Sequence, residues 1–377
     1  MLRLDRALEA TLLGRPVAGV LSEEDGCALR GQRMLVTGAG GSVGAELCRQ
    51  LAACGVARLT MMDHSEYALF RAEAEIRQLF PHVAVVTVLG DVTRRADVRV
   101  AMQMAQPQAV YHAAAYKHVT FAETAIVQAL RVNALGALEV ARAASAYDAR
   151  CVLISSDKAA EPRGVMGATK RFAELIVLST ATTRFRPIVV RFGNILGSSG
   201  SVAEILLERA AAGLRLPVTD PDATRYFMTA SEAVSLVVKT DLIARRPEIF
   251  WLDMGDPIRI GDLARRIADH AVTIGYRPGD IELIGLRAGE KLHEELTTQG
   301  LAMRRTAHPR IFSARQRPVS SAVVREALRQ ARRACASGDA QAALETLTAL
   351  VDDFAPSDMA RSHAAKSLTS SAAISAA

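Results

Sequence analysis

Two adjacent ionisable residues, Asp157 and Lys158, follow an apolar run and are preceded by Ser156. A carboxylate beside an amine can supply an acid and a base to one reacting centre, and a serine hydroxyl can bind a substrate oxygen. Lys170 comes later, with Met166 four residues before it. A thioether cannot exchange a proton in water, so Met166 cannot share this work. Taken alone, an Asp-Lys pair after a strand is typical of an exposed turn, and a helical Met of a core.

The pattern of residues 33–193 predicts the elements that must position these side chains. Short β-branched runs alternate with segments whose apolar residues recur at three- and four-residue spacing. This alternation is typical of an α/β fold with a doubly wound, Rossmann-type parallel sheet, whose strand ends carry the functional groups. The predicted strands are 34–37, 58–62, 83–89, 109–112, 151–155 and 187–191, and clear helical segments are 43–54, 67–80 and 166–180.

A glycine-rich turn joins the first predicted strand to the next helix. Gly38, Gly41 and Gly44 let the backbone approach a pyrophosphate, whose charge the helix N-terminus stabilises. Asp63 closes the second strand, where a carboxylate accepts hydrogen bonds from ribose hydroxyls and repels a 2′-phosphate. The sequence therefore predicts NAD rather than NADP as the cofactor. Further predicted cofactor contacts are Thr37, Ser42, Val43, Asp91, Val92, Ala113, Lys117 and Lys170.

Composition limits the class of protein. The 377 residues can bury a large core, and no apolar stretch reaches the roughly 18 residues of a membrane span. The N-terminus carries Asp5 and Glu9 inside its apolar pattern, which favours an amphipathic helix over a signal peptide. Five cysteines without metal-ligand spacing indicate a reducing, cytoplasmic setting and no metal site. The net charge of +6 is spread along the chain, which argues against nucleic-acid binding.

Six motifs occur in one order over residues 33–296: HAAAYKHV, LISSDKAAEPRGVMGATKR, RFGNILGSSGSV, TRYFMT, FWLDMGDPIRIGDLAR and GLRAGEKLHEEL. With the glycine turn they closely resemble the bacterial UDP-N-acetylglucosamine 4,6-dehydratases, extended short-chain dehydrogenases/reductases of polysaccharide and glycan biosynthesis. Membrane-anchored relatives have transmembrane helices and an extra N-terminal domain, and residues 1–30 resemble the linker that precedes their catalytic domain. The resemblance implies a UDP-sugar substrate, tightly bound NAD and a homo-oligomer, a dimer or larger.

The resemblance also implies a reaction. Hydride moves from sugar C4 to NAD⁺, the new ketone acidifies the C5 proton, the C6 hydroxyl leaves as water, and hydride returns to C6. Asp157 is then the acid for the leaving hydroxyl, and Lys158 is the C5 base, with a pKa lowered by burial near other cations. Ser156 binds the C4 oxygen and Lys170 holds the nicotinamide ribose. The implied substrate-binding residues are Lys117, Asn133, Asn194, Arg225 and Arg287.

Met166 stands where short-chain dehydrogenases/reductases carry an acid–base tyrosine. By the resemblance, tyrosine there marks enzymes that invert C5 and methionine marks the retaining branch, so Met166 predicts retention. The acceptor of the C4 hydroxyl proton stays open between Asp157 and a water held by Ser156. The alternatives are an inverting dehydratase, a UDP-sugar 4-epimerase and a non-catalytic NAD-binding protein.

The chain departs from the usual sequence of the family at Ala288 (commonly Pro), Glu161 (commonly Asn) and Thr120-Phe121.

The sequence patterns and the resemblance predict five segments of the chain. We expect an N-terminal helix and linker at 1–30, an NAD-binding domain at 31–193 and a mixed α/β, UDP-sugar-binding region at 194–317. Peripheral helices follow at 318–355. The small and polar residues of 356–377 predict a disordered tail.

Overall fold

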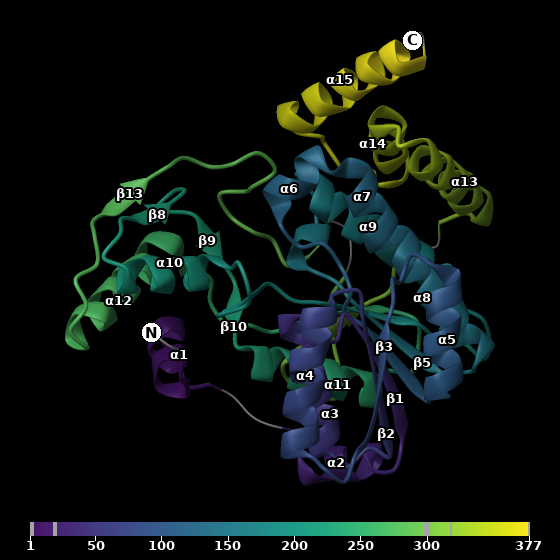
Figure 1. Ribbon diagram of the computed structural model, residues 1–377, viewed down its shortest axis with the longest axis horizontal. Coiled ribbons are helices and arrows are strands. Elements are labelled where there is room, and N and C mark those ends of the chain that lie inside the picture. Colours follow the sequence, from purple (N-terminus) through teal and green to yellow (C-terminus); the bar gives the residue numbers. More distant parts are fainter. Residues whose placement is uncertain (1–3, 18–20, 298–301, 317–318, 376–377) are drawn as a thin grey trace.

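The structure, a computed structural model, describes residues 4–17, 21–297, 302–316 and 319–375, and a nine-stranded sheet forms its centre (Figure 1). The first six strands along the chain agree with the predicted runs to within one residue at each end, which confirms the doubly wound α/β class. In sheet order the strands are β14 (Arg304–Arg305), β15 (Ile311–Ala314), β11 (Ile249–Leu252), β6 (Ile188–Arg191), β5 (Arg150–Ile154), β4 (Ala109–His112), β1 (Arg33–Thr37), β2 (Arg58–Asp63) and β3 (Ala84–Leu89).

The strand order creates a crevice beside β1. This strand pairs in parallel with β2 on one side and with β4 on the other, with Leu35 opposite both Thr60 and Val110. The chain therefore winds outward through β2 and β3 and then returns across the sheet to β4. In such sheets the loops separate at this switch point, and ligands bind there, outside the carboxyl ends of the strands.

Helices cover both faces of the sheet, because strands buried on both sides need apolar partners on both sides. One face carries α2 (Glu23–Leu29), α3 (Ser42–Ala53), α4 (Glu66–Leu79) and α11 (Ala230–Ile243). The other carries α5 (Arg95–Ala105), α7 (Ile126–Leu130), the π-helix η1 (Arg131–Gly136), α8 (Ala137–Ala146) and α9 (Val165–Leu178), and α6 (Val119–Thr124) packs on α9. Fully buried strand residues such as Val36 and Val110 separate the two apolar layers.

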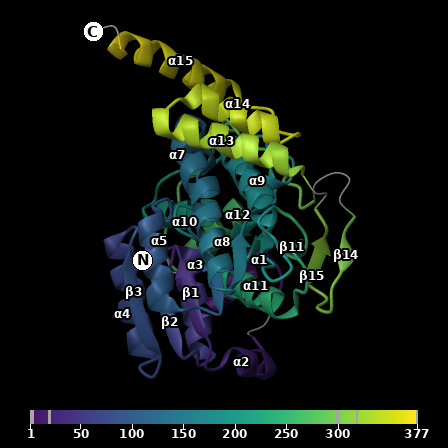
Figure 2. The same cartoon turned by 90° about the vertical axis from the view of Figure 1, so that its right-hand side faces the viewer.

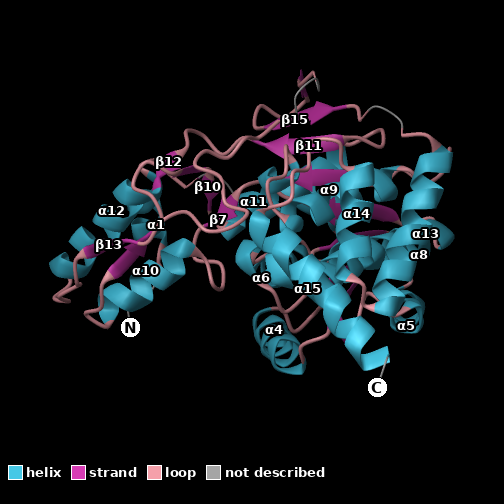
Figure 3. Cartoon of the chain, turned by 90° about the horizontal axis from the view of Figure 1, so that it is seen from above, coloured by secondary structure: helices cyan, strands magenta, loops and turns pink. Residues whose placement is uncertain are grey.

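A smaller unit stands beside the sheet and is set apart in the view from above (Figure 3). Its apolar cluster joins α1 to elements from residues 202–283 and includes Leu12, Leu206 and Leu263. The predicted region 194–317 is not one unit, however, because α11, β11 and β15 return to the main sheet. The smaller unit and its junction contain α1 (Arg6–Leu13), β7 (Asn194–Ile195), α10 (Val202–Ala211), β8 (Leu216–Val218), β9 (Thr224–Arg225), β10 (Phe227–Met228), β12 (Ile258–Arg259), α12 (Ile260–Thr273) and β13 (Ile281–Leu283).

Three C-terminal helices lie across the α7–α9 side of the molecule (Figure 2). They are α13 (Ser321–Ser337), α14 (Ala340–Leu350) and α15 (Asp358–Ser375). The last helix occupies the segment predicted as a disordered tail, and that prediction was wrong for its described part. Small and polar residues were the reason for predicting disorder, yet Ala360 and Ala364 are fully buried as α15 packs on α14 and α6. None of the described helices has both the length and the apolar character needed to cross a membrane.

A buried carboxylate connects this C-terminal segment to helix α9. Glu123 is fully buried, and its Oε1 accepts a hydrogen bond from the Val165 N–H, at the start of α9, at 2.7 Å. Its Oε2 accepts from the Ser357 hydroxyl, which precedes α15. Cβ atoms on Gly164 or Gly289 would each lie 2.8 Å from Oε1, so two further loops approach this carboxylate closely.

Candidate active site

The turn after β1 has the close approaches that require glycine. Gly38 has a φ of 70°, and a Cβ there would lie 2.6 Å from the backbone nitrogen of Ala114, in the loop after β4. A Cβ on Gly44 would lie 1.9 Å from the Gly38 carbonyl oxygen. Gly41 precedes α3 and has no side chain to cap it. The N–H groups of the first turn of α3 therefore remain available to an anion such as a phosphate.

Carboxylates at the ends of β2 and β3 lie where the sequence predicted adenosine contacts. Asp63 is almost buried, and its two oxygens accept hydrogen bonds from the Gly40 and Ser65 N–H groups, both at 2.9 Å. The carboxylate is thus tied to the glycine turn, where it can still accept from a ribose hydroxyl. Asp91 Oδ1 accepts from the N–H two residues later at 2.8 Å, and Val92 is buried.

Lys170 reaches back from α9 to the end of β5. Its Nζ donates to the Ile154 carbonyl at 2.9 Å, and burial lowers the pKa of this amine to about 8, opposed by Glu174. At the neighbouring end of β4, His112 Nδ1 is 2.7 Å from Thr37 Oγ1. Burial, with a contribution from Lys170, lowers the pKa of His112 to about 3, so this imidazole is neutral. The glycine turn, the Asp63 carboxylate and the buried amine together fit a dinucleotide.

Asp157 and Lys158 occupy the short 3₁₀-helix η2 (Asp157–Ala159), directly after β5. Asp157 is 1% exposed, and its Oδ1 accepts from the Ser156 hydroxyl at 2.8 Å and from Lys158 Nζ at 3.1 Å. Its Oδ2 is also buried, and no described residue hydrogen-bonds to it. A buried carboxylate oxygen without a partner is costly. This oxygen faces Gly193, where a Cβ would lie only 3.0 Å away.

The environment of Lys158 corrects one expectation. Besides Asp157, its Nζ donates to Asn194 Oδ1 at 3.0 Å and lies 3.4 Å from Glu294 Oε1. Burial lowers the pKa of Lys158, but the nearby Asp157 and Glu294 carboxylates outweigh burial, and the pKa is raised above 10.5. The sequence predicted a pKa lowered by burial near cations. That prediction was wrong because two carboxylates face the amine, whereas Arg225 is the opposing cation.

Glu294 is the residue that the sequence analysis missed. Its side chain is 3% exposed, and its Oε1 also lies 3.7 Å from Arg225 Nε. Arg225 donates to the carbonyls of Lys291 at 2.7 Å and Leu292 at 3.1 Å, so its guanidinium holds the loop that carries Glu294. The available signal was the GEKLHEEL motif, which contains Glu294, although spacing alone does not bring this residue to Lys158.

Met166 and Asn133 are both buried on the α9 side of the sheet. Met166 is 3% exposed and belongs to the apolar cluster of α8 and α9. Asn133, in η1, accepts from the Tyr116 N–H at 2.7 Å and donates to the Tyr116 carbonyl and Thr169 Oγ1, both at 3.0 Å. Its amide therefore fixes the loop after β4. The prediction that Asn133 binds substrate is corrected, because its side chain is 1% exposed and bonded on both ends.

The loop at residues 197–201 connects the two sides of the crevice. Lys117 Nζ donates to Ser198 Oγ at 3.2 Å, and Ser42 Oγ, in the glycine turn, accepts from the Ser199 N–H at 3.1 Å. Burial lowers the pKa of Lys117. Arg287, by contrast, is exposed, and its backbone N–H donates to Glu290 Oε2 at 3.0 Å. No contact among the described residues joins the Arg287 side chain to the Asp157–Lys158 pair.

The residues that depart from the usual sequence of the family lie in loops or at the ends of helices. Glu161 has a φ of 47°, a left-handed conformation that favours asparagine among non-glycine residues. Phe121 is 73% exposed and packs edge-on against His118, with ring centroids 6.1 Å apart. Ala288 lies in the loop that leads to Glu294, one residue before Gly289.

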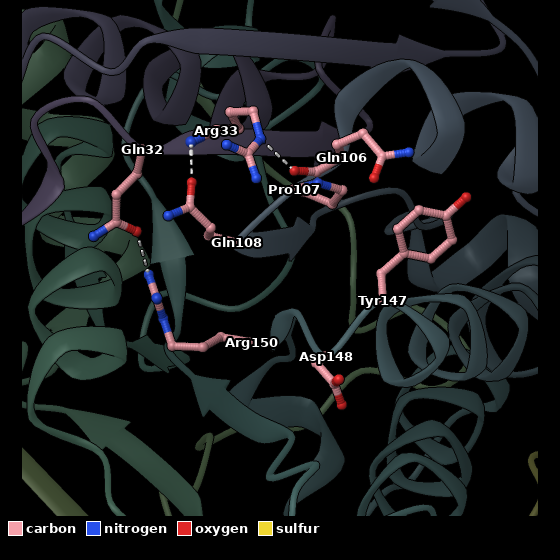
Figure 4. A pocket seen from close by; sticks show the side chains of 8 residues that line it. All are labelled: Gln32, Arg33, Gln106, Pro107, Gln108, Tyr147, Asp148 and Arg150. Atoms are coloured by element: carbon pink, nitrogen blue, oxygen red, sulfur yellow. Dashed lines mark hydrogen bonds between the residues drawn. The ribbon is translucent and has the colours of Figure 1, made fainter.

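One cavity lies beside the loop that carries Glu294, and another lies far from it. A cavity of about 410 Å³ is lined by Arg163 and by residues of the 289–295 loop, including Glu295. A second, of about 340 Å³, opens at the opposite edge of the sheet, where β1, β4 and β5 begin (Figure 4). The polar groups of this second cavity mostly bond to one another, as Arg150 does to Gln32 at 3.1 Å, and it lacks the buried unpartnered groups of the Asp157 site.

Comparisons with known proteins assign the chain to a family. The profile of the family described as "Polysaccharide biosynthesis protein" matches residues 34–316. The "Probable polysaccharide biosynthesis protein EpsC" of Bacillus subtilis is 40% identical over 303 residues, 80% of this chain and 50% of the relative, so the chain spans about half of that protein. A Campylobacter jejuni "UDP-N-acetylglucosamine 4,6-dehydratase (inverting)" is 30% identical over 273 residues, 70% of this chain and 77% of the relative. The structure of Pen from Bacillus thuringiensis aligns with a TM-score of 0.69 at 28% identity, over 78% of this chain and 92% of that one. The chain belongs to the polysaccharide biosynthesis protein family.

Proposed function

We propose that the protein is an NAD-dependent UDP-N-acetylglucosamine 4,6-dehydratase that retains the configuration at C5. The observation that carries this proposal is the buried Asp157–Lys158 pair, which follows β5 at the carboxyl edge of the sheet. An acid and a base in contact, next to a dinucleotide crevice, suit an elimination that is started by transient oxidation. The similarity to a Campylobacter jejuni UDP-N-acetylglucosamine 4,6-dehydratase, which its name describes as inverting, supports the substrate class.

The residues around the crevice fit NAD. Its phosphates would lie at the start of α3 beside Gly38 and Gly44, and Asp63 would bind the adenosine ribose. Lys170 would bind the nicotinamide ribose from the end of β5. When bound, the cofactor supplies a hydride acceptor for sugar C4 and a hydride donor for C6. It ends the cycle unchanged and can stay in place.

Ser156 and Asp157 provide a route for the C4 hydroxyl proton. The Ser156 hydroxyl donates to Asp157 Oδ1 at 2.8 Å, so a proton that leaves the sugar can reach the carboxylate through one side chain. The protonated Asp157 then gives this proton to the C6 hydroxyl, which leaves as water. The C4 proton thus ends on the released water, and the carboxylate returns to its first state.

Lys158 takes the C5 proton and returns it. It rests as an ammonium, so it must first release a proton to water before it can act as a base. The neutral amine removes the C5 proton while the C6 hydroxyl leaves, and the resulting ammonium protonates C5 after hydride has reached C6. Because one group performs both transfers from one side of the ring, the configuration at C5 is kept. Met166 offers no second proton donor on another face.

Incubation with UDP-N-acetylglucosamine tests the proposal. We expect a product that has lost one water, detected by mass spectrometry of the nucleotide sugar, with unchanged C5 configuration by NMR. An inverted C5 would refute retention alone. A product of unchanged mass with an altered C4 centre would identify a 4-epimerase instead.

Matched variants separate catalysis from a silent nucleotide-binding protein. Asp157→Asn and Lys158→Met should each lower turnover by about 10²- to 10⁴-fold, as expected when an acid or base is removed, while bound NAD is unchanged. Lys366→Met removes an exposed lysine on α15 and should leave turnover intact. An NAD-loaded wild type that releases no dehydrated sugar would refute the proposed function.

A further inference from the structure

Glu294 contacts the acid–base pair from a loop far away in sequence. Its Oε1 is 3.4 Å from Lys158 Nζ and 3.7 Å from Arg225 Nε. Its Oε2 is buried, and no hydrogen-bond partner for it exists among the described residues. Glu294 therefore combines a direct contact with the candidate base and an unused acceptor atom.

Lys158 faces two carboxylates, although one would be enough to pair with its ammonium group. Asp157 alone already contacts the ammonium at 3.1 Å, and Asn194, in β7, accepts a further hydrogen bond from Lys158 Nζ at 3.0 Å. A second carboxylate buried at the same amine is costly unless other cations hold it. Arg225, from β9, supplies that cation, and its guanidinium is fixed by the carbonyls of the same loop.

We propose that Glu294 is a positioning residue for Lys158: its carboxylate holds the amine opposite Asp157 until the substrate arrives. This inference rests on the proposed function for its role in turnover, but the contact itself does not. A substrate that displaces one of the two carboxylates from the amine would let Lys158 release its proton to water more readily and act as the C5 base.

The charged groups that face Lys158 determine in which direction its pKa moves when Glu294 is replaced. Asp157 belongs to the same short helix, Glu294 to the loop after residue 290, and Arg225 to β9. Two carboxylates raise the pKa of the amine, while burial and Arg225 lower it. Replacing Glu294 with the isosteric, neutral glutamine removes one of the raising charges, so the titration of Lys158 must move to lower pH.

NMR of protein labelled with ¹³C at lysine Cε measures this titration directly. The chain has only six lysines, and Lys158→Arg identifies the relevant signal. We expect Glu294→Gln to lower the titration midpoint of Lys158 by about 1 to 3 pH units, the range for an opposite charge within a few ångströms. Glu294→Asp, which keeps the charge, should return the midpoint toward the wild-type value.

Glu295→Gln is the matched control, because Glu295 is the exposed next residue and lines the outer cavity. It should leave the midpoint unchanged. A midpoint that is the same in Glu294→Gln and wild type, with the fold verified by thermal unfolding, overturns the proposal. Turnover then links the contact to function: the base-dependent limb of the kcat–pH profile should shift to lower pH in Glu294→Gln only. Wild type without dehydratase activity refutes the proposed function, whereas the NMR result judges the Glu294 contact independently.

Discussion

Replacing Glu174 with glutamine tests the buried charge cluster next to the candidate active site. Glu174 projects from α9, and its Oε1 accepts from Ser155 Oγ at 2.6 Å and from Arg191 Nε at 2.7 Å. Its Oε2 accepts from Arg191 Nη2 at 2.5 Å and from Arg171 Nη1 at 3.0 Å. Arg191 is fully buried and its guanidinium lies 5.5 Å from the centre of the Trp251 ring. The cluster therefore ties α9 to the ends of β5 and β6.

The expected cost follows from this burial. Glu174→Gln leaves a fully buried guanidinium without its carboxylate, a change that typically costs about 3–5 kcal/mol. Burial raises the pKa of Glu174, but Arg191 and Arg171 outweigh it and the pKa lies below 4.5. The carboxylate therefore stabilises the fold fully above pH 4.5, and this contribution disappears as pH falls through the lower folded-state pKa. The variant should lack this part of the acid dependence.

Denaturant unfolding at neutral and acidic pH measures both effects. Trp251 is the only tryptophan and contacts Arg191, so its fluorescence reports on the cluster itself, and far-UV circular dichroism follows the whole fold. Glu326→Gln is the control: it removes an exposed carboxylate paired with Arg329 and should change nothing measurable. A loss under about 1 kcal/mol in Glu174→Gln at neutral pH would refute the argument from buried pairing.

Three further predictions address the cofactor and the C-terminal segment. Gly44→Ala should abolish bound NAD, measured by chromatography of nucleotide released on denaturation, whereas Gly26→Ala, with no neighbour nearer than 4.0 Å, should retain it. Since burial lowers the pKa of Lys170 to about 8, its cation is lost as pH rises through 8. NAD retention should decline there in wild type and not in Lys170→Arg; a flat wild-type profile would contradict this. Ser357→Ala removes the hydroxyl from buried Glu123 and should cost about 1–3 kcal/mol in denaturant unfolding, and an unchanged midpoint would count against that role.

Local patterns predicted the parallel sheet because they arise from local physics. A run of β-branched residues predicts a strand that is buried on both faces. A glycine-rich turn between a strand and a helix predicts a phosphate-binding turn. Asp63, at the end of β2, and Lys170, which reaches from α9 to the end of β5, could therefore be named before the structure was known.

Long-range pairing is what the sequence could not predict. Glu294 and Lys158 lie far apart in the sequence, so the sign of the pKa shift at Lys158 depends on a contact that no local spacing encodes. Asn133 has the right type for a ligand, yet the π-helix turns its amide onto Tyr116. The return of β11 to the sheet likewise depends on pairing with β6, across some 60 residues of other structure.

The C-terminal helices have a consequence for where this protein can be divided. Similarity to the family ends at residue 316, but the apolar layer on that side continues: Leu328 of α13 and Leu347 of α14 share one buried cluster with Phe172 of α9. The matched family segment and the buried apolar layer therefore have different boundaries. A chain cut at residue 316 would leave the outer surface of α7 and α9 bare, an exposed apolar patch of the kind that promotes aggregation.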